Sequence, residues 1–169
     1  QFFLAGIYKI FGHHYGPVWA IQALLRAISA LLLFLICKLI FGREGRLMGW
    51  IAAAFFGFYP DLIEIAAMLM TETFFIFFLI LFLYVFILYY NKPSIRGTFY
   101  LALVFGLAIL IRSSIGLFLP VLIFYFWRQK ALKFLFLFLI LIAIILTPWT
   151  VRNYMVYNEF LPTMANFGF

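Results

Sequence analysis

Long apolar runs alternate with short polar turns along the whole chain. A helix needs about twenty apolar residues to cross a bilayer, and fewer where the protein thins the bilayer or buries the helix. This requirement predicts six crossings, at residues 18–41, 47 to about 65, 73–90, 98–111, 115–127 and 134–149. Residues 1–17 mix Phe and Ile with Gly and Lys, a pattern typical of a helix that lies in the membrane interface. We therefore expect a juxtamembrane segment at 1–17, a transmembrane helical domain at 18–150 and the start of an outer-face loop at 151–169.

The composition indicates that lipid surrounds most of the chain. Hydrophobic residues make up 69% of the 169 residues and charged residues only 10%, whereas about a quarter of the residues of a soluble domain are charged. In lipid every backbone N–H and C=O must be paired within the protein, and the apolar runs lack the alternation of a barrel strand. The predicted fold class is therefore all-α, a polytopic transmembrane helical bundle.

The basic residues predict an orientation. A net charge of +7 would suggest nucleic acid as the partner of a soluble protein, but here Lys and Arg lie mostly in short turns, so we expect no nucleic acid. Residues 98–127 can form either a short hairpin or one long tilted helix interrupted at 112–116. With a hairpin, three basic turns share one side, which is the positive-inside pattern, so we favour the hairpin and place both chain ends outside the cytoplasm. The basic residues on that side are Lys38, Arg43, Arg46, Lys92, Arg96, Arg128, Lys130 and Lys133.

The opposite face collects the candidate functional residues. Four of the five acids lie there together with two arginines. Acids contribute little to orientation, so a site explains this gathering better than topology does. The residues concerned are His13, His14, Asp61, Glu64, Glu72, Arg112, Arg152 and Glu159.

Two arginines of this face suit a phosphate group. Arg112 interrupts the hairpin, whose helices are each only about 20 Å long, so the turn must sit below the headgroups in a wet or protein-lined cavity. Arg152 follows Pro148 and Trp149, which indicate a helix end at the interface. Arg112 has the simpler interpretation of snorkelling to lipid headgroups, and Arg152 that of a membrane anchor. Together they offer planar donors for a phosphate on the outer face.

Glu72 is the candidate catalytic residue. It stands at the start of the third crossing in LMTETFF, where a carboxylate can orient an acceptor hydroxyl or amine, or assist a base. Its other interpretation is a carboxylate at the positive end of the helix dipole. Asp61 and Glu64 are three residues apart and would share a helix face, but we favour a solvated loop for both.

The remaining polar residues favour ordinary roles. Adjacent His13 and His14 seldom converge on one ion, so we assign no metal ligand, and the sequence names no cofactor. Cys37 is the single cysteine and favours packing. Arg26 lies about two turns into the first crossing, so we expect it to face an internal water-filled cavity or to pair with an acid. The sequence contains no phosphate loop, HExxH, CxxC or nucleophile elbow, which argues against ATP-driven transport, Rossmann chemistry and zinc proteolysis.

Several segments, taken in order, carry a family resemblance. They are IYKIFG (7–12), IQALLRAISALLLFLICKLIFGREGRLMG (21–49), FYPDLIEIAAMLMTETFFIFFLILFLYVF (58–86), LVFGLAILIRSSIGLFLP (103–120) and TPWTVRNYMVYNEFLPT (147–163). Their order and spacing resemble the GT-C superfamily of integral-membrane glycosyltransferases, specifically the family-thirty-nine-like group with protein O-mannosyltransferases and the lipid A aminoarabinose transferase. The resemblance covers nearly the whole chain.

The resemblance implies roles for the site residues. Arg112 resembles the family's basic residue near the donor phosphate, Glu72 its acidic residue at the outer end of that span, and Arg152 a basic residue often found after the following span. The family's catalytic acid lies in a first outer loop, after a span that this sequence lacks, and no residue here matches it. For this reason, and because the chain starts at Gln1, we expect a fragment.

The implied reaction transfers a sugar from a polyprenyl-phosphate donor to a glycan, lipid or protein acceptor, with inversion at the anomeric carbon. Its implied place is the outer face of a bacterial cytoplasmic membrane. Two other functions stay open. One is a transporter or flippase for an anionic lipid-linked substrate, with Arg26, Arg112 and Arg152 along its path. The other is a non-catalytic membrane subunit whose charges only anchor it.

Overall fold

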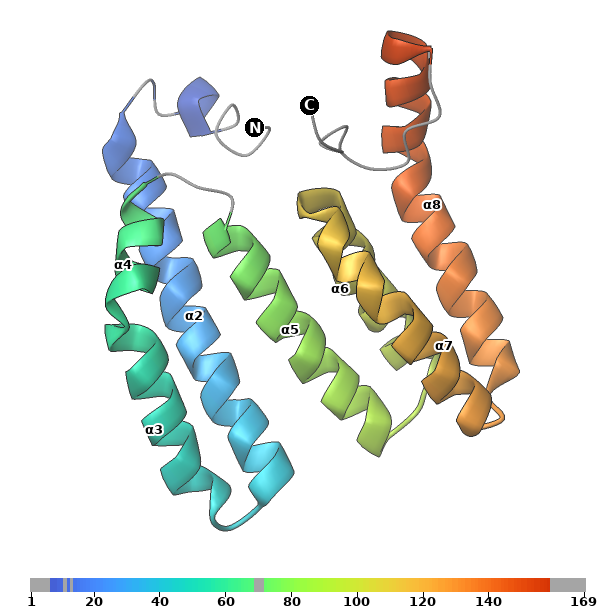
Figure 1. Ribbon diagram of the computed structural model, residues 1–169, viewed down its shortest axis with the longest axis horizontal. Helices are drawn as coiled ribbons and strands as arrows, with labels where there is room; N and C mark the ends of the chain where they lie inside the picture. Colours follow the sequence, from blue (N-terminus) through green and yellow to red (C-terminus); the bar gives the residue numbers. More distant parts are fainter. Residues whose placement is uncertain (1–6, 11, 13, 69–71, 159–169) are drawn as a thin grey trace. The chain divides into compact units, whose positions relative to one another are not determined.

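The computed structural model describes residues 7–10, 12, 14–68 and 72–158, and the regular structure in these residues is entirely helical. The helices form two compact units, Gln1–Ile80 (unit 1) and Leu81–Phe169 (unit 2), and α5 begins in the first and ends in the second (Figure 1). The elements are α2 (Tyr15–Phe41), α3 (Gly45–Phe58), α4 (Pro60–Ala67), α5 (Glu72–Asn91), α6 (Ile95–Ile111), the 3₁₀ helix η1 (Ser113–Phe118), α7 (Leu119–Arg128) and α8 (Leu132–Tyr157). The predicted all-α fold class is confirmed.

The helices differ in whether they are long enough to span a bilayer. Three described helices are long and apolar enough to cross, at Tyr15–Phe41, Glu72–Asn91 and Leu132–Val156. The other three predicted crossings coincide with shorter apolar helices, at Gly45–Phe58, Ile95–Ile111 and Ser113–Arg128. The 17 residues of α6 rise about 25 Å, less than the hydrocarbon thickness of about 30 Å. A short helix is tolerated where protein rather than lipid surrounds it, and α6 buries eight of its residues within unit 2.

The second predicted crossing is not one helix. α3 ends at Phe58, Tyr59 is extended (φ −65°, ψ 117°), and Pro60 occupies the first turn of α4. The pyrrolidine ring disfavours helical dihedrals in the residue before it and removes one backbone donor, so the helix stops and restarts here. Asp61 and Glu64 therefore lie on a short helix, and the predicted loop for them is wrong.

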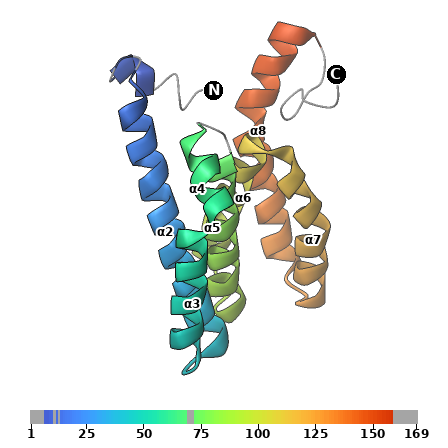
Figure 2. The ribbon, with the colours of Figure 1, turned by 60° about the vertical axis from the view of Figure 1, so that its left-hand side comes forward.

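The helices α2 and α3 of unit 1 form a hairpin with very close main chains. Figures 1 and 2 show α3 returning alongside α2 after the turn at 42–44. A Cβ on Gly45 would overlap the carbonyl oxygen of Cys37, and one on Gly49 would lie 2.9 Å from the carbonyl oxygen of Phe34. Small residues four apart allow such approach between membrane helices, which lack a hydrophobic force to drive them together.

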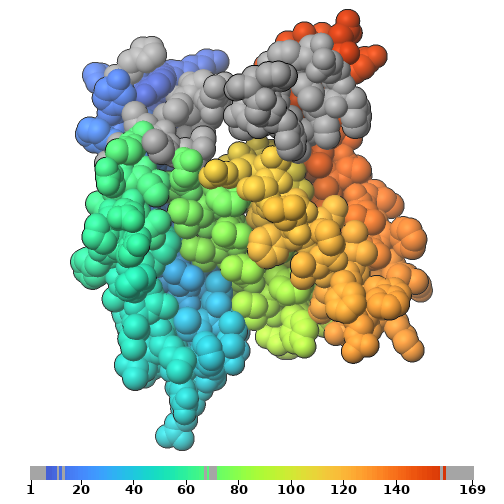
Figure 3. Space-filling view, in the orientation of Figure 1, coloured from blue at the N-terminus to red at the C-terminus, as the bar shows by residue number. Residues whose placement is uncertain are grey.

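The core of unit 2 is built from aromatic rings around α6. Phe105 of α6 is fully buried, with its ring centroid 5.1 Å from that of Phe82 on α5 and 5.8 Å from that of Phe138 on α8. Phe126 of α7 completes the cluster, with its ring centroid 5.5 Å from that of Phe138. α7 also exposes large apolar side chains, among them Phe124, and forms part of the surface of unit 2 in Figure 3.

The predicted helix end at Pro148 and Trp149 is wrong, because α8 continues to Tyr157 with Pro148 inside it. A proline leaves the carbonyl four residues earlier without its usual donor, here that of Ile144. In the same stretch of α8, Thr147 donates to the Ala143 carbonyl at 2.7 Å and Thr150 donates to that of Leu146 at 3.0 Å. The described part of segment 151–169 is thus mostly helix rather than loop.

Candidate functional site

Arg112 stands at the reversal between α6 and α7. Its extended backbone (φ −150°, ψ 117°) ends α6, although its N–H still donates to the Ala108 carbonyl at 2.9 Å. The Ile115 N–H donates to the Arg112 carbonyl at 3.3 Å and begins η1, while the Ile115 side chain is buried and anchors the turn. The predicted hairpin is confirmed, because the helix breaks at Arg112 and α7 runs back toward the start of α8 (Figures 1 and 2). The Arg112 side chain is exposed.

The Arg152 side chain, on the last turns of α8, contacts two nearby residues, Trp149 and Asn153. Its Nη1 donates to Asn153 Oδ1 at 3.4 Å, and its guanidinium carbon lies 5.0 Å from the centre of the Trp149 ring. A guanidinium at this distance from an indole face gains a cation–π attraction. Asn153 is only 3% exposed, so it can fix the guanidinium from the buried side of the helix. The rest of the Arg152 side chain is exposed.

Arg112 and Arg152 come to a similar level at one end of unit 2. Successive reversals make α6 and α8 run in the same direction, and Gly106 lies against Ile145, with a Cβ on Gly106 only 3.0 Å from Ile145 Cγ2. Arg112 lies about 9 Å beyond Gly106 along the axis, which is level with about residue 151 on α8. Two cationic, planar donors are therefore presented near the same height by neighbouring helices.

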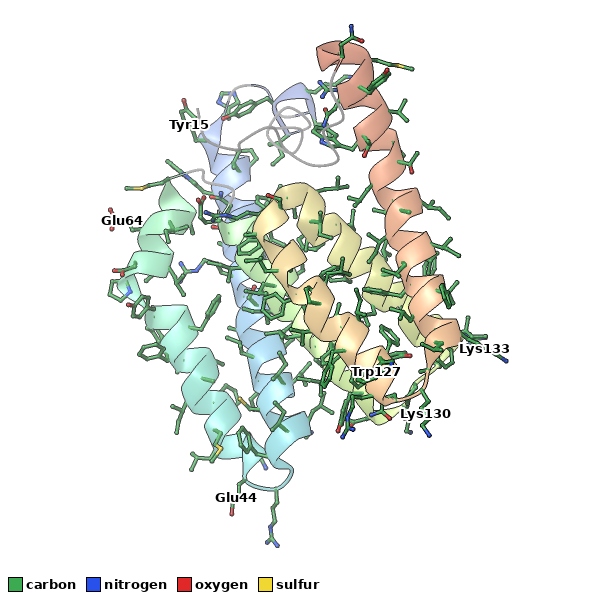
Figure 4. All side chains as sticks on the ribbon, turned by 45° about the vertical axis from the view of Figure 1, so that its right-hand side comes forward. Tyr15, Glu44, Glu64, Trp127, Lys130 and Lys133 are labelled. Atoms are coloured by element: carbon green, nitrogen blue, oxygen red, sulfur yellow. The ribbon has the colours of Figure 1, made fainter. Side chains whose placement is uncertain are left out.

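The opposite end of unit 2 carries basic residues of a different kind. The α7–α8 turn presents Arg128, Lys130 and Lys133, all exposed, and Figure 4 shows Lys130 and Lys133 at the end of the unit where Trp127 lies. An aromatic and basic belt of this sort is ordinary at a membrane interface. The arginines at the other end differ from this belt. Arg112 stands at a helix break, and Arg152 is hydrogen-bonded to the buried Asn153.

Three of the predicted acidic residues, Asp61, Glu64 and Glu72, lie in unit 1. Glu72 is the first residue of α5 and is partly exposed. Asp61 lies in the first turn of α4, and Glu64, three residues on, is exposed and points away from α2 in Figure 4. A carboxylate in a first helical turn is favoured by the helix dipole, so the positions of Asp61 and Glu72 have a structural reason. Glu72 and the two arginines belong to different units, so the role of Glu72 stays a prediction.

Arg26 lines a small cavity in unit 1, together with Ser29 and Thr73. Its Nη2 donates to the carbonyl oxygen of Gly57 at 3.1 Å. The sequence predicted either a cavity or an acid for this arginine, and the hydrogen bond found goes to a carbonyl. The signal that could have identified it is Pro60, because a helix break beside a proline leaves carbonyls that need a donor.

The other candidates of the predicted outer face contribute less. His14 precedes α2 as its N-cap without a side-chain cap bond and is exposed. His13 and Glu159 lie outside the described residues. Cys37 is a half-buried free thiol, and the packing role of its side chain stays a prediction.

Comparison with known proteins gives one informative match. The family model described as dolichyl-phosphate-mannose-protein mannosyltransferase matches residues 1–151. No curated protein and no solved structure matches the chain significantly. The matched range includes α2 to α7, most of α8, and both Glu72 and Arg112, and it ends immediately before Arg152.

Proposed function

Because the chain belongs to the dolichyl-phosphate-mannose-protein mannosyltransferase family, we propose that it transfers a sugar from a polyprenyl-phosphate-linked donor to an acceptor at the extracytoplasmic face. The family identifies an integral membrane glycosyltransferase of the mannosyltransferase type, which works on a lipid-linked donor in a membrane. The observation that carries the finer proposal is the packing of Gly106 on Ile145, from which helical rise places Arg112 and Arg152 at a similar level at one end of unit 2.

The transfer reaction requires positive charge near the phosphate of the donor, where the sugar–phosphate bond is cleaved. In the transfer, the bond between the anomeric carbon and the phosphate oxygen is cleaved, and a bond from that carbon to the acceptor oxygen forms on the opposite side. Negative charge develops on the lipid phosphate as it leaves. Guanidinium groups fixed in advance stabilise this charge strongly where bulk water is excluded, and their planar donors match phosphate oxygens.

Glu72 has the complementary role in this proposal. A carboxylate at the start of α5 orients the acceptor hydroxyl through a hydrogen bond, and the acceptor proton leaves to a base that we do not assign to this chain. The three basic turns support the placing of the site on the extracytoplasmic face. They follow Phe41, Asn91 and Arg128, that is, every second crossing, and such turns stay in the cytosol.

The test is sugar transfer by the intact protein in lipid nanodiscs, with radiolabelled polyprenyl-phosphate mannose as the probe. Arg112→Ala should lower the rate about 100-fold, the size seen when one donor to a developing oxyanion is removed. Arg112→Lys should recover only part of it, because an ammonium keeps the charge but not the fork of donors. Arg128→Ala, an exposed arginine at the other end of the same unit, is the matched control and should change little.

The contrary results are equally definite. If the wild-type protein neither transfers nor hydrolyses the labelled donor, the proposed function is wrong. If transfer is present and Arg112→Ala and Arg128→Ala behave alike, the proposed phosphate site is wrong while the activity stands.

A further inference from the structure

The small cavity of unit 1 is polar although the surrounding helices are apolar. It lies between α2, α3, α4 and the first two turns of α5, and leaves about 10 Å³ for the centre of a water molecule. That is about the smallest space that holds one water. The wall is formed by Arg26, Ser29, Phe56, Leu62, Ile65, Thr73 and Ile76.

Two polar atoms at this cavity have no hydrogen-bond partner in the part of the chain that the structure describes. Thr73 is only 5% exposed, and its Oγ1 has no hydrogen-bond partner among the described residues. The same holds for the buried Nε of Arg26, although the Nη2 of that arginine is bonded to Gly57. Polar groups that are buried in a membrane protein without a partner are costly, so such atoms are normally satisfied by an ordered water if no side chain reaches them.

Ser29 supplies a third polar atom. Its hydroxyl donates to the Leu25 carbonyl at 2.8 Å, so the proton is committed and the oxygen can still accept a hydrogen bond. The cavity thus offers one obligatory donor in Arg26 Nε, one acceptor in Ser29 Oγ, and one group in Thr73 Oγ1 that does either. A buried water needs two to four such partners, and the positive charge of Arg26 excludes a metal cation.

We propose that Arg26, Ser29 and Thr73 bind one buried water molecule that joins α2 to the start of α5. The water accepts from Arg26 Nε and donates to Thr73 Oγ1 and Ser29 Oγ. The other end of the guanidinium binds the Gly57 carbonyl, which the break at Pro60 leaves without its helical donor. Arg26 and its water therefore connect α2, the end of α3 and α5 into one polar joint.

The joint has a consequence that rests on the proposed function. Thr73 directly follows Glu72, so fixing the Thr73 hydroxyl fixes the first turn of α5 and the direction in which Glu72 leaves it. Arg26 and Thr73 are then positioning residues for the acceptor side of the reaction, while Arg112 and Arg152 bind the donor.

The water is tested by solid-state NMR on the intact protein in nanodiscs, with ¹⁵N-labelled arginine. The Arg26 Nε–H signal is assigned by its loss in Arg26→Lys and should receive magnetisation from water. Thr73→Val, which keeps the shape and removes the hydroxyl, should weaken this transfer severalfold, and Thr73→Ser should restore it. Thr147→Val is the control, because the Thr147 hydroxyl is exposed and bonded to its own helix. If wild-type Nε receives no magnetisation, or if Thr73→Val leaves it unchanged, the water site is refuted.

The positioning role is tested separately by kinetics. Thr73→Val should lower kcat about tenfold, as small misplacements of reacting groups do, and leave KM for the polyprenyl-phosphate donor nearly unchanged. Thr73→Ser should regain most of the rate. A rise in donor KM at constant kcat would refute positioning of the acceptor side. Absence of transfer by the wild-type protein would count against the proposed function alone, because the NMR result stands without activity.

Discussion

The two units join their helices by different physical means. In unit 1, α2 and α3 meet main chain to main chain at Gly45 and Gly49, with no room for a single added carbon. In unit 2, α6 packs its own Phe105 against rings such as Phe82 and Phe138, and Gly106, where α6 meets α8, faces only the side chain of Ile145. Both kinds of contact hold helices together in lipid. Lipid supplies no hydrophobic force between helices, so packing must provide the attraction.

The difference predicts how each unit responds to change. Backbone atoms cannot rotate away, so a contact between main chains either fits or separates the helices. Rings and aliphatic side chains can adjust, so their contacts weaken in steps. The arginines of the candidate site differ between the units as well. The close hairpin of unit 1 carries Arg26 beside a helix break, whereas Arg112 and Arg152 of unit 2 are exposed.

The largest expected effect is that of Gly45→Ala. The added methyl would overlap the Cys37 carbonyl oxygen and lie 2.8 Å from Lys38 Cα, both main-chain atoms, so the hairpin must open. We expect a loss of more than about 3 kcal/mol and little folded protein. The measurement is the yield of monodisperse protein in detergent and its apparent Tm. Gly16→Ala, where nothing lies within 4 Å of the new carbon, is the control. Equal yields for the two variants would show that the main chains are not in contact.

The next effect is that of Phe105→Ala in unit 2. Phe105 is fully buried between the rings of Phe82 and Phe138. Its removal leaves a cavity and forfeits the dispersion contacts, for about 3 kcal/mol. Phe136→Ala removes the same ring from a position that is 63% exposed and should cost almost nothing. Thermal unfolding in one detergent compares the pair, and a similar drop in Tm for both would contradict the ring-centred core.

The sequence was sufficient for most of the fold because hydrophobic length alone selects membrane helices. It located the turn at Arg112 through loop charge, and the structure has it there. It failed at the two prolines in opposite ways. Pro60 breaks a helix that was expected to continue, while Pro148 lies inside one that was expected to end. The outcome depends on how the surrounding helices pack against each proline, which is a property of tertiary structure.

The sequence predicted the residues of the candidate site and the membrane face they share, but not how they are arranged there. The level shared by Arg112 and Arg152 follows from the packing of Gly106 on Ile145. The hydrophobic pattern of two helices does not predict which of their residues come into contact. The support of Arg152 by Asn153 and Trp149 is likewise local geometry beyond the expected helix end. The Gly57 partner of Arg26 lies 31 residues away in the chain, and a sequence pattern does not encode that distance.

A smaller effect is expected for Gly106→Ala. The new carbon would lie 3.0 Å from Ile145 Cγ2 and 3.1 Å from its Cδ1, and this side chain can shift by a few tenths of an ångström. We expect a cost of about 1 kcal/mol. Ile145→Val removes the Cδ1 contact, so the double variant should lose less than the sum of the single ones. Strict additivity of the changes in Tm would mean that α6 and α8 do not touch at this point.

The smallest expected loss of stability is that of Ser94→Ala, because Ser94 takes part neither in the main-chain contact of unit 1 nor in the ring cluster of unit 2. Ser94 caps α6, and its Oγ accepts from the Gly97 N–H at 3.0 Å. Ser94→Ala leaves that N–H to the solvent at an exposed turn, which costs about 1 kcal/mol or less. Ser94→Asp keeps an acceptor and adds a charge favourable to the start of a helix, so it should retain the wild-type Tm. Because neither variant touches the rings of unit 2, both should leave donor binding unaltered. A Ser94→Ala loss as large as that of Phe105→Ala would mean that the short α6 depends on its cap rather than on the surrounding rings.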